Sequence, residues 1–163
     1  MKALIIYDSF FGNTEKIAQA IGETLSSSME VEVCKVSEVK QEQLKEINLL
    51  LVGSPTRGFM PSPAIKKFLR SIHSDGLKNI KAAAFDTRIS EDDAKIRILR
   101  FLMKVFGYAA EPISKKLRNK GAEIVVSPEG FCVKDTEGPP KEDELERAKS
   151  WALKIQENYN SIK

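Results

Sequence analysis

The loop after the first predicted strand carries residue types that suit an anion. This first loop is Ser9-Phe10-Phe11-Gly12-Asn13-Thr14, which follows a short apolar run and leads into a helical pattern. Glycine lets a backbone approach an anion closely, and Ser9, Asn13, Thr14 and the first N–H groups of a helix are suitable donors. The partial positive charge of a helix N-terminus makes a Lys or Arg unnecessary. An ordinary helix start, with Asn13 or Thr14 as the cap, explains the same residues equally well.

Three other classes of phosphate site are excluded by the residues present. A P-loop needs a Lys directly after its last glycine, and no Lys follows Gly12. A dinucleotide fingerprint needs three glycines, whereas this loop has one. A response-regulator receiver would, by resemblance, have an aspartate at the end of the third strand, where this chain has Gly53-Ser54-Pro55.

Apolar runs alternate with helical patterns along the chain, which predicts one α/β domain over residues 1–163. The patterns predict helices over 15–28, 38–46, 62–72 and 109–120, and a last one from about Lys141 with Leu145, Ala148, Ala152, Ile155 and Tyr159 on one side. Strands are predicted over 3–7, 30–36, 47–52 and 82–85, with a fifth in two pieces, 124–126 and 131–133. We therefore expect a doubly wound five-stranded parallel sheet in the order 2-1-3-4-5, with helices on both faces. Ligands bind such sheets at the carboxyl ends of the strands, so the loops after strands one, three and four are the candidates.

Two of these loops resemble the FMN-binding loops of the flavodoxin family. The stretch Tyr-Asp-Ser-Phe-Phe-Gly-Asn-Thr-Glu-Lys-Ile-Ala (7–18) is similar to its phosphate loop, usually Ser/Thr-x-Ser/Thr-Gly-Asn/Ser-Thr. The stretch Val-Gly-Ser-Pro-Thr-Arg-Gly-Phe-Met-Pro (52–61) is similar to its loop after strand three, and 138–148 resembles the start of its final helix. Phe11 departs from the pattern, because many members have a hydroxyl residue there. An aromatic residue at this position resembles the flavodoxin domain of the flavo-diiron proteins. The resemblance implies a flavodoxin-like three-layer sandwich that binds FMN.

The resemblance also implies a role for each candidate residue. Residues of the first loop would hold the phosphate, and those after strands three and four would lie along the isoalloxazine. Gly58 is the candidate for a peptide that turns to accept a hydrogen bond from N5 of the reduced flavin, since glycine tolerates both orientations. Arg57 and Arg88 either place positive charge near the ring or face solvent. The predicted cofactor-binding residues are Ser9, Phe10, Phe11, Gly12, Asn13, Thr14, Pro55, Thr56, Arg57, Gly58, Phe59, Asp86, Thr87 and Arg88.

The leading functional hypothesis is an FMN-binding electron carrier that serves a redox partner protein or a small electron acceptor. An FMN-dependent NAD(P)H:quinone-type oxidoreductase is the alternative, and a flavin-free interaction module on the same fold is the third possibility. The net charge of +3 favours acidic partners over the basic partners of acidic flavodoxins. The basic residues of the chain form no run, which argues against nucleic acid as a partner.

The cysteine content favours a reducing, cytoplasmic setting. It is 42% hydrophobic and 30% charged, and its N-terminus is interrupted by charge too soon for a secretory signal. Cys34 and Cys132 lie far apart without a CxxC pattern, and His73 is the single histidine. We therefore expect neither a disulfide framework nor a metal site.

Residues 91–106 do not fit a minimal flavodoxin, because the loop after strand four is commonly shorter there. They form a helical pattern in which one polar stripe interrupts a broad apolar surface. The segment could act as a lid over the flavin, as a homodimer interface or as a helix lying on a membrane surface. The membrane surface is the least expected of the three.

Overall fold

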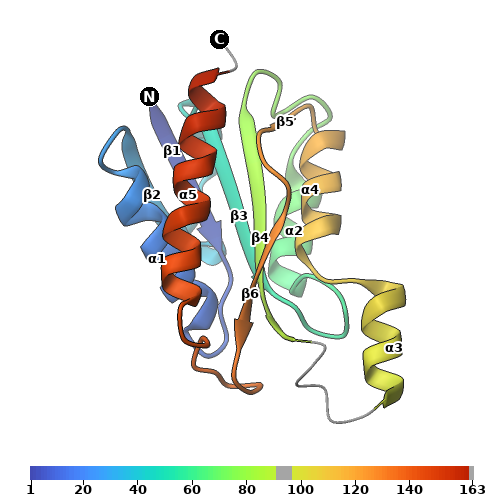
Figure 1. Ribbon diagram of the computed structural model, residues 1–163. Helices are drawn as coiled ribbons and strands as arrows, with labels where there is room; N and C mark the ends of the chain where they lie inside the picture. The colour runs from blue at the N-terminus through green and yellow to red at the C-terminus, as the bar shows by residue number, and fades with distance from the viewer. Residues whose placement is uncertain (91–96, 162–163) are drawn as a thin grey trace.

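The computed structural model describes residues 1–90 and 97–161 as a parallel sheet between two helical layers (Figure 1). The strands are β1 (Lys2–Tyr7), β2 (Glu30–Lys35), β3 (Leu49–Pro55), β4 (Lys81–Ile89), β5 (Glu123–Ile124) and β6 (Glu129–Val133). The helices are α1 (Asn13–Leu25), α2 (Pro63–Ser71), α3 (Arg97–Phe106), α4 (Ala110–Asn119) and α5 (Glu144–Ser161), with short 3₁₀ turns η1 (Val36–Glu38) and η2 (Gln41–Lys45). The strand order is β2-β1-β3-β4-β5, which confirms the predicted doubly wound topology.

The predicted interruption of the fifth strand is confirmed. β5 pairs with the beginning of β4 and β6 pairs with its end, both in parallel, so the two pieces share one edge of the sheet. β4 is longer than predicted and continues through Asp86, Thr87 and Arg88. These three residues therefore belong to the end of a strand and not to a loop.

Alternating side chains of the strands pack against the two helical layers. On β1, Ala3, Ile5 and Tyr7 join the cluster formed with α1 and α5, whereas Leu4 and Ile6 join the cluster formed with α2 and α4. Because both faces are covered, the strand reads as a continuous apolar run in the sequence.

Two helix starts differ in how well the sequence predicted them. Ser62 caps α2 by accepting a hydrogen bond from the Ile65 N–H at 3.3 Å, and Pro63 is the first helical residue, as predicted. α1 begins at Asn13, two residues before the predicted start, because the turn at Gly12 leads directly into it. Of the residues predicted to share one side of the last helix, Ala148, Ala152 and Ile155 are buried together with Trp151, whereas Leu145 is 41% exposed.

Gly53 on β3 lies against the ring of Phe85 on β4. A Cβ at position 53 would stand 2.2 Å from the ring Cζ. Phe85 cannot easily move aside, because it is fully buried and packs edge-on against Phe131 and Trp151. We expect Gly53→Ala to lower the free energy of unfolding by about 1–3 kcal/mol in urea denaturation. Adding Phe85→Leu should recover part of that loss, and a Gly53→Ala protein as stable as the parent would show that the ring has room to shift.

Candidate functional site

A cleft of about 240 Å³ lies at the carboxyl ends of β1, β3 and β4, where the predicted loops meet. Every predicted site residue lines it except Gly12, Phe59 and Asp86. Ile89, Val133 and Thr136 also line it, and these were not predicted. β1 and β3 are neighbours at the centre of the sheet, where the chain reverses its direction of winding, so the cleft lies at the switch point.

The first loop presents a helix N-terminus to this cleft. Gly12 has a φ of 80°, a left-handed conformation that favours glycine, and the helix begins at the next residue. Within the described chain no side chain caps α1, and the first helical bond runs from the Lys16 N–H to the Gly12 carbonyl. The N–H groups of the first turn therefore remain available as donors at the end that carries partial positive charge.

Asn13 and Thr14 link this loop to other parts of the cleft. The Asn13 amide donates to the Glu137 carbonyl at 3.0 Å, and Gly138 packs so closely that a Cβ there would overlap the Asn13 side chain. The hydroxyls of Thr14 and Thr87 lie 2.9 Å apart and are buried. One of these two hydroxyls donates to the other, so the pair keeps one O–H for a further acceptor.

The second loop forms a tight hairpin turn. The Arg57 N–H bonds the Met60 carbonyl at 3.0 Å, and the Met60 N–H bonds the Arg57 carbonyl at 3.1 Å. Gly58 and Phe59 between them have φ values of 53° and 66°, which defines a type I′ turn. The left-handed conformation costs a non-glycine residue about 1–2 kcal/mol, so the turn is strained at Phe59. Its ring contacts that of Phe106 on α3, with centroids 5.7 Å apart.

Arg57 and the aromatic residues of the first loop form the outer rim. The Arg57 guanidinium lies 4.9 Å from the centroid of the Phe10 ring. Phe10 and Phe11 are 49% and 46% exposed although both line the cleft. Exposed aromatic rings at a cleft rim suit a flat ligand, because a ring that stacks there removes them from water.

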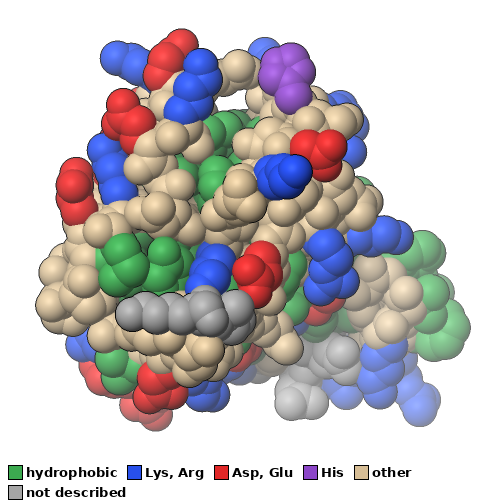
Figure 2. Space-filling model, turned by 90° about the horizontal axis from the view of Figure 1, so that it is seen from above, with side chains coloured by type: hydrophobic (Ala, Val, Ile, Leu, Met, Phe, Trp, Pro, Cys, Tyr) green, Lys and Arg blue, Asp and Glu red, His purple; other side chains and the backbone are tan. Residues whose placement is uncertain are grey.

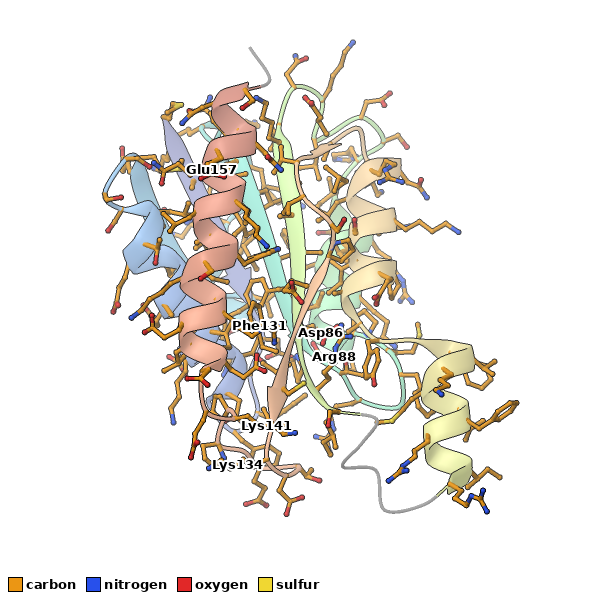
Figure 3. The ribbon with its side chains drawn as sticks, in the orientation of Figure 1. Asp86, Arg88, Phe131, Lys134, Lys141 and Glu157 are labelled. Carbon is orange, nitrogen blue, oxygen red and sulfur yellow. The ribbon has the colours of Figure 1, made fainter. Side chains whose placement is uncertain are left out.

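Asp86 and Arg88 form a buried ion pair beside the cleft, where Figure 3 shows both at the lower half of β4. The guanidinium donates to both carboxylate oxygens at 2.6 Å, and the Ala110 N–H donates to the same carboxylate at 2.8 Å. The Arg88 guanidinium also stacks on the Tyr108 ring at 3.8 Å and lies against Gly130. Its positive charge is thus balanced by Asp86, which differs from both arrangements considered for Arg88 from the sequence.

Burial and ion pairing have opposite effects on the pKa of Asp86. Burial raises the pKa of Asp86 above its ordinary value, while the hydrogen bond and charge of Arg88 act to lower it. Asp86 has no exposed surface at all, so its side chain shapes the cleft only through Arg88 and the start of α4.

Three other side chains that could react, those of Cys34, Cys132 and Tyr7, do not line the cleft and keep their protons at neutral pH. Cys34 is half-buried on β2, at the opposite edge of the sheet from Cys132 on β6, so the two do not pair. Burial raises the pKa of Cys34 to about 11 and also raises that of Cys132, which keeps both as thiols at neutral pH. Burial and a hydrogen bond to Glu15 raise the pKa of Tyr7 to about 12.

Residues 1–90 and 97–161 contain no group of three or more His, Cys, Asp or Glu side chains that could hold a metal ion. None of the helices there is both long and apolar enough to cross a membrane.

Comparison with known proteins agrees with this fold. The flavodoxin family model matches residues 5–151. A flavodoxin of Clostridium saccharobutylicum is 32% identical over 109 residues, which cover 63% of this chain and 68% of that protein. A solved flavodoxin from the domain Archaea superposes with a TM-score of 0.76 at 26% identity, covering 98% of this chain and 99% of that one. Rubredoxin oxygen:oxidoreductase from Desulfovibrio gigas gives a TM-score of 0.74 at 21% identity, and the match covers 98% of this chain but 36% of that protein.

The chain therefore belongs to the flavodoxin family. Flavodoxins bind FMN and transfer electrons to redox partners, so the predicted family, fold and cofactor are confirmed. Two further curated relatives are matched over only 19% and 41% of their length. Some members of this structural group, such as the Desulfovibrio gigas protein, contain the fold as one part of a larger chain.

Proposed function

We propose that this protein is an electron carrier that holds FMN in the cleft at the ends of β1, β3 and β4. The observation that supports this most is the meeting of an uncapped helix N-terminus and the type I′ turn at Gly58 in one cleft. FMN has an anionic phosphate at one end and a flat redox ring at the other. The cleft has hydrogen-bond donors on the side of the first loop, and exposed aromatic rings and the turn at Gly58 at its rim. When bound, FMN supplies the capacity to accept and release one or two electrons.

The phosphate fits the first loop. Gly12 leaves open space, since a Cβ there would meet nothing within 4 Å. The donors are the first N–H groups of α1, the Ser9 hydroxyl and the Thr14–Thr87 hydroxyl pair. These are neutral groups at a positive helix end, which together bind phosphate without a paired cation.

The isoalloxazine fits between the rim aromatics and the turn at Arg57–Met60. Thr56, Arg57 and Gly58 line this side of the cleft and Thr87 and Arg88 line the other. Because Arg88 is already paired with Asp86, Arg57 is the side chain that would bring net positive charge to the ring.

The turn at Gly58 has two accessible forms. In a type I′ turn both central residues have positive φ, whereas in type II′ only the first does. Turning the Gly58–Phe59 peptide over would convert one form into the other. It would relieve the backbone strain at Phe59 and require a backbone conformation at position 58 that glycine adopts readily. The Gly58 carbonyl would then be available to accept a hydrogen bond from N5 of the reduced flavin.

Gly58→Ala should hinder that turn and make the FMN harder to reduce. Both forms have positive φ at position 58, but the turned form combines it with a ψ of about −120°, which a side chain disfavours more than the left-handed helical conformation. A difference of about 1.4 kcal/mol between the two forms corresponds to about 59 mV for one electron. We therefore expect the midpoint potential of the first electron to fall by roughly 50 mV in a spectroelectrochemical titration. Gly107→Ala is the matched control, because Gly107 also has positive φ and open space but lies outside the cleft. Equal potentials for the Gly58→Ala protein and its parent would contradict the proposed role of the turn.

The proposal as a whole is tested by titrating the purified protein into FMN and following flavin fluorescence and absorbance. Binding with quenched fluorescence supports the cofactor site, and a protein that leaves free FMN unchanged would support the flavin-free interaction module instead. Steady turnover of NADPH with a quinone would favour the oxidoreductase over the carrier. The net charge of +3 makes an acidic redox protein the favoured partner of the carrier.

A further inference from the structure

α3 presents an apolar face to solvent. Ile98, Phe101 and Val105 are 66%, 65% and 58% exposed. Their spacing of three and four residues places them on one face of the helix. Met103, by contrast, is buried against the domain, whereas Phe106 is 63% exposed and also contacts Phe59. Three large exposed side chains on one face are unusual for a helix whose only contact is its own domain.

Among the described residues, the charges on the helices beside this face are almost all positive; Glu91, Asp92 and Asp93, which precede α3 in the sequence, lie outside the described residues. α3 has Arg97, Arg100 and Lys104 and no acidic residue. α2, α3 and α4 together carry nine basic residues and one acidic residue; these are Lys66, Lys67, Arg70, Arg97, Arg100, Lys104, Lys115, Lys116 and Arg118, against Glu111. The opposite layer, α1 and α5, carries four basic and five acidic residues; these are Lys16, Arg147, Lys149 and Lys154, against Glu15, Glu23, Glu144, Glu146 and Glu157. The positive charge of these described helices is therefore concentrated on one side of the sheet.

The position of α3 argues against a lid. The described residues that line the FMN cleft include none from α3. Figure 1 shows the helix standing to the side of the sheet, beyond α4. Figure 2 shows hydrophobic and basic side chains next to one another where this part of the molecule projects outward. The exposed face therefore lies on a projecting ridge of the molecule.

The charge distribution also argues against a second copy of this chain. A twofold contact through α3 would bring two basic helices together, with like charges from α2 and α4 on both sides. An acidic protein would satisfy the charge, but it would need a concave apolar surface shaped to receive the ridge. A fluid anionic surface satisfies the charge and the apolar face together without any matching shape.

We propose that α3 docks on the surface of a bilayer that contains anionic lipids. Ile98, Phe101 and Val105 insert among the headgroups, while the basic side chains that border them meet lipid phosphates. A helix with a basic side and an apolar side, lying in the plane of the interface, binds membranes in this way. Each basic residue near an anionic surface adds about fivefold to the affinity. Through the contact of Phe106 with Phe59, docking holds the rim of the FMN cleft beside the membrane.

Co-sedimentation with vesicles tests this proposal on the full chain. The probes are vesicles of phosphatidylcholine alone and vesicles with one third phosphatidylglycerol. We expect binding to the anionic vesicles, little binding to phosphatidylcholine, and a loss of binding as salt is raised. Absence of binding to the anionic vesicles at low salt would overturn the proposal.

Two variants separate the apolar and the charged contributions. Phe101→Ser with Val105→Ser should weaken binding more than tenfold, and Lys104→Glu should weaken it at least fivefold. The matched control is Leu145→Ser with Leu153→Ser, which removes two exposed leucines from α5 on the opposite layer and should leave binding unchanged. All these side chains are exposed, so the variants should keep the parent's circular dichroism. Equal loss from the α3 and α5 variants would overturn the proposal. So would a dimer in solution that the Phe101 and Val105 changes convert to monomer.

Discussion

Arg88→Met is expected to lower the free energy of unfolding by about 3–5 kcal/mol. The substitution keeps the length of the side chain but removes the guanidinium that bonds both carboxylate oxygens of Asp86. Asp86 has no exposed surface, so water cannot replace the lost partner. One N–H group, that of Ala110, would remain to stabilise a buried negative charge. Urea or thermal denaturation of the protein without FMN measures the effect.

The pH dependence of this loss identifies its cause. Burial raises the pKa of Asp86, and removing Arg88 removes the main group that lowers it, so the pKa rises further. A carboxyl with a raised pKa in the folded state gives stability that is present at low pH and lost as the pH rises through that pKa. The difference between variant and parent should therefore be smaller at roughly pH 5 than at pH 7.

A double variant provides the control for the Arg88 prediction. Asp86→Asn with Arg88→Met removes both charges, and the Asn carbonyl oxygen can still accept from the Ala110 N–H. We expect the double variant to recover most of the stability, because replacing both partners of a buried pair is often close to neutral. A single variant that loses less than about 1 kcal/mol would contradict the account of Asp86 as a fully buried charge.

The sequence predicted the parts of the site that depend on local pattern. The loop 9–14 could be recognised because a glycine and small polar residues stand between an apolar strand and an amphipathic helix. Parallel topology then placed that loop beside the ends of β3 and β4, since all their carboxyl ends meet at one edge. The predicted fold and the predicted FMN cofactor follow from the loop pattern, the parallel topology and the resemblance to the flavodoxin loops.

The sequence did not predict contacts made by distant residues. Tyr108 stacks on Arg88 and Gly130 packs against it, although neither belongs to a recognised motif. Thr136 enters the cleft because the loop before α5 folds back over Asn13, with Gly138 in close contact. A Gly-Pro-Pro stretch signals a turn, but it does not say which loop the turn will cover. The pairing of Arg88 with Asp86 was equally hidden. Two residues apart on a strand, they share a face, and burial of that face forces them together.

Thr14→Val is expected to weaken FMN binding by about ten- to a hundredfold. The side chain keeps its shape, loses its hydroxyl and stays in a position that is 1% exposed at the first turn of α1. A hydrogen bond to a charged group contributes about 1.5–3 kcal/mol, and about 1.4 kcal/mol corresponds to a factor of ten in affinity. Fluorescence titration with FMN measures the loss. Thr24→Val is the control, because its hydroxyl bonds the Ala20 carbonyl at the far end of the same helix.

Riboflavin, which has the same ring but no phosphate, shows whether Thr14 contacts the phosphate. We expect riboflavin to bind the Thr14→Val protein and its parent equally well, so that the preference for FMN falls. An equal loss for both ligands would mean that the Thr14–Thr87 hydroxyl pair only joins α1 to β4. Thr87→Val distinguishes the two hydroxyls further. It removes the partner at 2.9 Å but leaves the Thr14 O–H free to donate outward, so its effect on FMN should be smaller than that of Thr14→Val.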